Sequence, residues 1–247
     1  MVRYKLLIEY DGTDFHGWQL QPDVRTVQGE IEQALQTVFK DRLRLSAAGR
    51  TDTGVHAAGQ VAHFDAPHFL PVERIRGSLN ALTGRDVVVH AVDEVDETFH
   101  ARFSAQARQY FYRIALQKTA IHRRLAFYPG QLTHVPAMQE ASQCLMGSHD
   151  FRAFSKKIPG EKHYLCDVEQ VEWFREGEML IFRIRANRFL HSMIRLLIGG
   201  LVKVGKGQLS PQQFAEILHS RQQNNTIYKA PANGLCLEKV YYPRHHA

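Results

Sequence analysis

The stretch with the clearest chemical potential spans residues 47–57, where one carboxylate stands among turn-forming and polar side chains. Asp52 lies between two threonines and is bracketed by Gly49 and Gly54, which adopt positive φ readily and allow a tight loop. We expect the positive charge of Arg50, two residues earlier, to favour the ionised form of this carboxylate. An anionic Asp52 in a cleft can act as a nucleophile or as a general base. The same residues also fit an ordinary Asx turn, in which the carboxylate caps nearby N–H groups.

The elements that must position this loop follow from hydrophobic periodicity. Apolar runs before and after it predict strands near residues 42–48 and 59–65, and the alternation over residues 2–10 predicts a half-buried strand. Loops held by a rigid sheet are a common place for catalytic side chains. The remaining predicted elements of this half are a helix capped by Thr26 with Val27, Ile31, Ala34, Leu35, Val38 and Phe39 on one face, a helix starting at Pro71 with Ile75, Leu79 and Leu82 inward and ending at Gly84, and a strand over residues 87–95.

The same order of elements recurs from residue 106. It comprises a strand through Tyr110, a helix after Pro136, strands near 164–175 and 178–187, a helix from about Arg188, a shorter helix after Pro211 and a strand over 235–241. Spacing along the predicted helix places Arg188, His191 and Arg195 on one side of it. Each half is roughly βαββαβ. We therefore predict an α+β protein with two domains, 1–105 and 106–247, whose sheets adjoin and leave a cleft between the halves.

Composition favours an anionic partner. The chain has 247 residues, and its 31 Lys and Arg against 25 Asp and Glu give a formal charge of +6. Cations are interleaved with aromatic residues, as in the run 108–113, which is typical of contacts to structured RNA. Solvated charges flanking core aromatics are the alternative. Lys156, Lys157 and Lys162 likewise fit either phosphate contacts or a solvated loop.

Several classes of protein are disfavoured. No apolar stretch approaches the roughly 20 residues of a membrane span, and the N-terminus lacks the pattern of a secretory signal, so we expect a cytoplasmic protein with no membrane partner. The three cysteines have no C-x-x-C spacing, and the 14 histidines form no H-E-x-x-H pattern. We expect neither a metal nor any other cofactor.

The run from Gly49 to Ala57, GRTDTGVHA, resembles the active-site signature G-R-T-D-x-G-V-H-A of the tRNA pseudouridine synthases of the TruA family. Nine residues with little degeneracy make this resemblance specific. Further segments resemble the family in the same order and extend the likeness over essentially the whole chain: Tyr10–Gln19, Phe99–Ala105, His149–Ser155, Phe189–Gly200, Ala230–Ala232 and Tyr242–Pro243.

The resemblance implies a pseudouridine synthase fold with mainly antiparallel sheets and the active site in the cleft. It also implies the conversion of uridine to pseudouridine at positions 38, 39 and 40 of the tRNA anticodon stem-loop. It implies that Asp52 is catalytic, that Arg50 helps to hold a flipped nucleotide, that Tyr110 stacks on the target base, and that Arg195 reaches Asp52 across the cleft. It also implies a homodimer, with each tRNA spanning both subunits. A base inside a stem must leave the stack before it can react, at a cost of a few kcal/mol. RNA contact is open for Phe15, His16, Trp18 and Gln19, with core packing as the alternative for Phe15 and Trp18.

Three other functions are compatible with parts of the sequence. A non-catalytic protein that binds structured RNA would have the same charge and aromatic residues, and turnover would separate it from an enzyme. A nucleotide-binding enzyme is suggested by residues 200–206, which match most of a G-x-x-x-x-G-K phosphate loop, although Gly207 replaces the Ser or Thr. A hydrolase with paired carboxylates at a glycosidic bond would need Asp65 or Asp150 to approach Asp52.

Overall fold

The computed structural model describes residues 1–156, 163–222 and 226–243, which form two compact units. The first comprises Met1–Ala107 together with the segment from Cys236, and the second comprises Arg108–Leu235. The predicted division at residues 105 and 106 placed the last strand in the second domain. The structure groups that strand with the first unit, because it pairs with a strand there.

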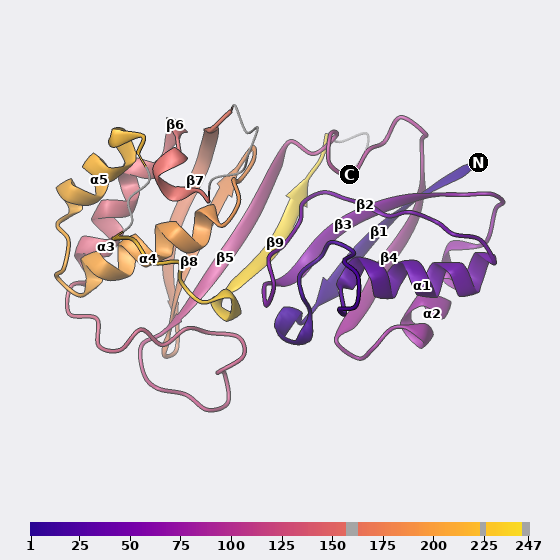
Figure 1. The fold of residues 1–247 in the computed structure, drawn as a ribbon, viewed down its shortest axis with the longest axis horizontal. Helices are drawn as coiled ribbons and strands as arrows, with labels where there is room; N and C mark the ends of the chain where they lie inside the picture. Colours follow the sequence, from indigo (N-terminus) through magenta and orange to yellow (C-terminus); the bar gives the residue numbers. More distant parts are fainter. Residues whose placement is uncertain (157–162, 223–225, 244–247) are drawn as a thin grey trace. The chain divides into compact units, whose positions relative to one another are not determined.

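The first unit is a sheet covered by helices (Figure 1). Its elements are β1 (Val2–Tyr10), η1 (Gly12–Asp14), α1 (Val27–Phe39), β2 (Ser46–Ala47), β3 (His56–Ala66), α2 (Val72–Leu82), β4 (Val87–Val95) and β9 (Leu235–Tyr241). Within it the strands lie in the order β4-β1-β3-β9. β1 is antiparallel to both β4 and β3, whereas β9 runs parallel to β3.

The predicted helices of this unit are confirmed, with one error in α2. Thr26 caps α1 by accepting the Gly29 N–H at 3.3 Å, and Ile31 and Leu35 are fully buried. In α2, Ile75 and Leu79 are buried as predicted, but Leu82 is 48% exposed because the helix ends there, at the edge of its apolar face.

The strand predicted near residues 42–48 is mostly irregular, with only Ser46–Ala47 paired to β3. Side chains of α1 hold this segment instead. Glu32 accepts the Leu45 N–H at 2.9 Å, and the Gln28 amide donates to the Leu45 carbonyl at 3.3 Å. Leu43 and Leu45 are buried, which accounts for the apolar run without a strand.

The second unit repeats the plan of helices on a sheet, with α3, α4 and α5 packed on one another (Figure 1). Its elements are β5 (Ala107–Ala115), α3 (Val135–Ser142), η2 (Gln143–Leu145), β6 (Gly147–Asp150), η3 (Arg152–Phe154), β7 (Leu165–Glu176), β8 (Met179–Ala186), α4 (Met193–Gly205), α5 (Pro211–Ser220) and η4 (Ala232–Gly234). The strand order is β5-β8-β7-β6, and neighbouring strands are antiparallel. The short strand β6 was not predicted. The α+β class with mainly antiparallel sheets is confirmed.

Candidate active site

Asp52 begins a tight turn that follows the short strand β2. The Val55 N–H donates to the Asp52 carbonyl at 3.1 Å, and Gly54 has a φ of 76°, which favours glycine at this place. The Asp52 side chain is half-buried, and Arg50 on the same loop is exposed. The structure therefore presents the carboxylate on an ordered turn, two residues from a cation.

The segment that follows β1 packs directly against this turn. The Trp18 N–H donates to the Thr51 carbonyl at 3.1 Å, and the Gly54 N–H donates to the Phe15 carbonyl at 3.3 Å. Phe15 and Trp18 are 1% and 2% exposed, so both are core residues, whereas the neighbouring His16 and Gln19 are exposed. Of the four residues for which RNA contact was open, only the exposed pair retains that possibility.

Gly17 sits where the two backbones approach most closely. Its φ is 87°, and a Cβ there would lie 2.7 Å from the Thr51 carbonyl oxygen and 3.2 Å from the Asp52 carbonyl carbon. Only glycine satisfies both the positive φ and the contact. The segment 15–18 and the Asp52 turn therefore form one close-packed backbone layer.

Two buried side chains also join these segments. The hydroxyls of Tyr10 and Thr51 are 2.7 Å apart, and both residues are less than 10% exposed. The Gly12 N–H donates to Nδ1 of buried His56 at 3.1 Å, and Asp11 Oδ1 lies at the same distance from that nitrogen. Sequence reasoning missed these partners, since their spacing follows no local pattern.

Arg25 ties the same segment to the rest of the first unit. Its guanidinium donates to both Asp86 oxygens, at 2.6 and 2.8 Å, and to Glu30 at 2.8 Å, and it stacks 4.1 Å from the centre of the Phe15 ring. The hydrogen bond from Arg25 lowers the pKa of Asp86. This network also went unpredicted, because its members are far apart in the chain.

In the second unit, Tyr110 lies on β5 and is 8% exposed. Its ring makes an edge contact with Phe189, with centroids 5.2 Å apart and planes at 81°. Much of the ring thus packs within the second unit.

Arg195 lies in the first turn of α4 and is half-buried. Its Nε donates to the Ala230 carbonyl at 2.7 Å, and the Ala230 N–H donates back to the Arg195 carbonyl at 3.0 Å. Gly199 permits this approach, because a Cβ there would overlap the carbonyl oxygen of Tyr228. Arg195 also lies near buried Tyr112, whose pKa is raised by burial and lowered in part by this cation.

The predicted cluster of cations on one helix face is wrong. α4 begins at Met193, so Arg188 and His191 precede it and cannot share its face with Arg195. The helix starts late because Ser192 adopts a left-handed conformation, with φ 60°, and the Lys156 N–H is bonded to the carbonyl of His191.

The phosphate-loop match is also wrong. Residues 200–205 lie inside α4, where Gly200 faces Phe214, so there is no loop whose N–H groups could surround a phosphate. Asp65, one candidate second carboxylate, instead binds Arg3 through two hydrogen bonds of 2.7 and 2.8 Å. It lies nine residues along β3 from His56, which is about 30 Å of extended strand.

Other features of the described residues bear on the remaining predictions. Among residues 1–156, 163–222 and 226–243, no three His, Cys, Asp or Glu side chains gather as a metal site would require. Within the same part of the chain, none of the helices combines the length and apolar character of a membrane span. Lys156 is exposed, and Lys157 and Lys162 lie outside the described residues.

Comparison with known proteins decides the family. A profile of the family described as "tRNA pseudouridine synthase" matches residues 6–104 and 141–243. The chain belongs to the tRNA pseudouridine synthase family. It is 44% identical over 239 residues to tRNA pseudouridine synthase A of Chlorobaculum tepidum, covering 96% of this chain and 97% of the relative. It is 42% identical over 244 residues to the Chlorobium luteolum protein of the same name, covering 98% and 96% of the two chains.

Family membership confirms the pseudouridine synthase fold that the sequence motifs implied. Both matched ranges contain residues of the candidate site: Arg50 and Asp52 fall in the first, and Arg195 in the second. Tyr110 falls between them. Asp52 and Arg50 belong to the first compact unit, and Tyr110 and Arg195 to the second.

Proposed function

We propose that this member of the tRNA pseudouridine synthase family converts uridines 38, 39 and 40 of the tRNA anticodon arm into pseudouridine. The observation that carries the proposal is the Asp52 turn, in which the signature GRTDTGVHA forms an ordered loop that leaves the carboxylate half-buried. A carboxylate in this setting suits attack on, or proton removal from, the sugar or base.

The reaction is an isomerisation. The bond from N1 of the base to C1′ of the ribose breaks, the uracil turns, and a bond forms from C5 to C1′. The hydrogen on C5 leaves and N1 gains a proton, so no atom is added or lost overall. Asp52 acts as the nucleophile or base in this sequence, and the balance requires no redox partner. The expectation that no cofactor is used stays a prediction.

The other site residues have roles that fit their chemistry. Arg50 is an exposed cation that can hold a phosphate or carbonyl of the flipped nucleotide. The stacking of Tyr110 on the target base stays a prediction, because the residue is 8% exposed in this structure. Base–aromatic stacking contributes about 1–3 kcal/mol per base. The pairing of Arg195 with Asp52 would join residues of different units and stays a prediction.

The basic composition suits an RNA substrate, because lysine and arginine neutralise phosphates and release counterions. We further propose that the protein acts as a homodimer and works in the cytoplasm. Light scattering tests the first of these, and a monomer that remains fully active would refute the need for a dimer.

Tritium release tests the reaction and its aspartate together. tRNA transcripts labelled at uridine C5 should release tritium with the native protein, and the product should map to positions 38–40. Asp52→Asn keeps the shape of the side chain but cannot attack, so it should bind tRNA and release no tritium. Asp23→Asn is the matched control, because Asp23 is an exposed aspartate with φ 59°, a conformation that asparagine also adopts.

The results also separate the enzyme from an RNA-binding protein without activity. Binding with no release by the native protein would favour the second function. Release by Asp52→Asn at the native rate would refute the role of Asp52 but not the reaction.

A further inference from the structure

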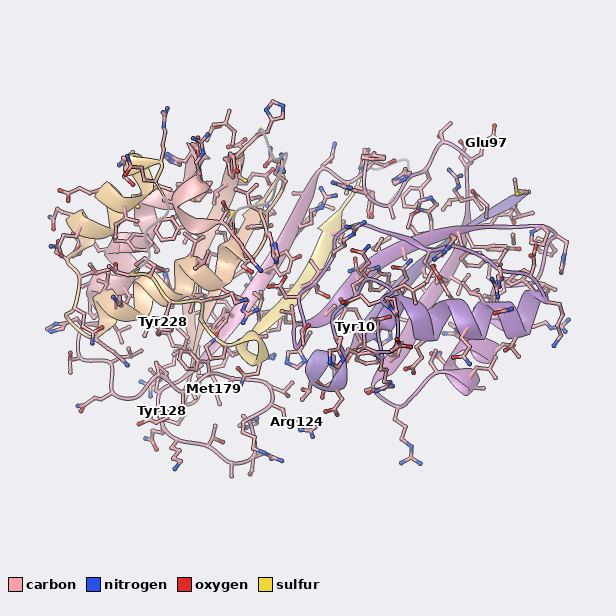
Figure 2. All side chains as sticks on the ribbon, viewed as in Figure 1. Tyr10, Glu97, Arg124, Tyr128, Met179 and Tyr228 are labelled. Carbon is pink, nitrogen blue, oxygen red and sulfur yellow. The ribbon has the colours of Figure 1, made fainter. Side chains whose placement is uncertain are left out.

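Strand β1 carries two buried tyrosines whose hydroxyls have different partners. Tyr4, near its start, bonds to the backbone of Leu70, accepting the N–H and donating to the carbonyl, each at 2.9 Å. Tyr10, the last residue of the strand, meets the hydroxyl of Thr51 at 2.7 Å. Figure 2 shows Tyr10 near the end of β1, in the part of the first unit where the strand gives way to η1.

Thr51 directly precedes Asp52, so whatever holds it also holds the start of the turn. Its carbonyl accepts the Trp18 N–H at 3.1 Å and its hydroxyl meets Tyr10, so the residue is bonded through both backbone and side chain. Thr51 is 7% exposed and Tyr10 2%, so water has little access to replace a lost hydroxyl partner. Removing one of two buried hydroxyls that bond to each other therefore leaves the other unsatisfied, at a cost in free energy.

We infer that Tyr10 and Thr51 are positioning residues, and that their hydroxyl pair fixes the direction of the Asp52 carboxylate. This inference rests on the proposed role of Asp52. The pair links two points 41 residues apart in the chain through one short contact. The backbone bonds from Trp18 and Gly54 keep the turn folded without it, while the hydroxyl pair sets the orientation of the residue before Asp52.

Tyr10→Phe tests this directly, with Tyr4→Phe as its matched control. Both variants remove one hydroxyl from a buried tyrosine of the same strand, and the Tyr4 hydroxyl bonds to Leu70, which follows β3 at its far end. We expect similar falls in the melting temperature. For Tyr10→Phe we expect kcat for tritium release to fall about tenfold or more, with KM for tRNA changed less than about twofold. Tyr4→Phe should leave both constants within about twofold of the native values.

Substitutions at Thr51 provide the second readout. Thr51→Val keeps the shape and removes the hydroxyl, so it should match Tyr10→Phe, whereas Thr51→Ser retains the hydroxyl and should restore most of kcat. The double variant Tyr10→Phe, Thr51→Val should lose no more than either single change, because both remove one interaction.

Different outcomes test the positioning role of Tyr10 and Thr51 and the proposed role of Asp52. If Tyr10→Phe loses no more kcat than Tyr4→Phe, or if the two single losses add in the double variant, the positioning role is refuted. If Asp52→Asn is measured alongside and proves fully active, the proposed function of Asp52 fails instead.

Discussion

Replacing Gly17 by alanine should damage catalysis through the backbone of the Asp52 turn. At φ 87° an alanine costs about 1–2 kcal/mol relative to glycine. The new Cβ would also lie 2.7 Å from the Thr51 oxygen, whereas ordinary contact begins at 3.4 Å, so the turn must move by roughly 0.7 Å. Such overpacking adds about 1–3 kcal/mol. We expect a total loss of stability of about 2–5 kcal/mol.

A shift of this size at Asp52, the proposed catalytic residue, should lower kcat by about 10- to 100-fold, because a misplacement near 1 Å costs about that much. Urea unfolding gives the stability, and tritium release from C5-labelled tRNA gives kcat and KM. We expect KM to change little, since the residues proposed to contact tRNA are retained.

Gly130→Ala is the control that isolates backbone strain. Gly130 has the same φ of 87°, but a Cβ there would meet no atom within 4 Å. Gly130→Ala should lose only the stability that backbone strain costs, about 1–2 kcal/mol, and keep the native kcat. Equal stability losses in the two variants, or a native kcat in Gly17→Ala, would refute the idea that close backbone contact orients Asp52.

Three further predictions concern stability. The pKa of His63 is lowered from 6.5 to about 4, first by burial and then by the positive charges of His100 and Arg3 nearby. Between these two pH values the unfolded chain binds a proton at His63 that the native state does not bind. The free energy of unfolding should therefore fall by about 2 kcal/mol, after allowance for solvent screening, as the pH drops from about 6.5 to 4. In urea unfolding at pH 7.5 and pH 4.5, His63→Asn should show a smaller fall in stability than the native protein. Gly199→Ala should cost at least about 3 kcal/mol and lower the melting temperature sharply, because its Cβ overlaps the Tyr228 carbonyl; a native melting temperature would contradict this packing. Ser210→Ala removes the capping box of α5 and should cost about 1 kcal/mol in urea unfolding, with unchanged kcat.

Local sequence patterns predicted most of the secondary structure. The alternation in β1 and the Thr26 cap of α1 depend on neighbouring residues alone, and both are confirmed. The predictions that failed lie where tertiary contacts override the pattern. Leu43 and Leu45 are buried without forming a strand, because Glu32 and Gln28 of α1 bond to the Leu45 backbone.

In the candidate site, too, features that depend on neighbouring residues were predicted and features that depend on the three-dimensional fold were not. Asp52 stood out because a carboxylate between glycines, within a specific signature, is visible in nine consecutive residues. The helix face predicted for Arg195 included Arg188, since sequence spacing alone could not reveal that α4 starts at Met193.

Sequence patterns were enough to identify the carboxylate to examine, the order of most elements around it and the family resemblance. Only the tertiary structure showed that Tyr10 meets Thr51, that Gly17 lies against the turn and that Arg25 joins Asp86 and Glu30. The physical reason is separation along the chain. Periodicity and capping report interactions within a few residues, whereas the contacts of Tyr10 and Gly17 with the Asp52 turn join segments brought together only when β1 pairs with β3.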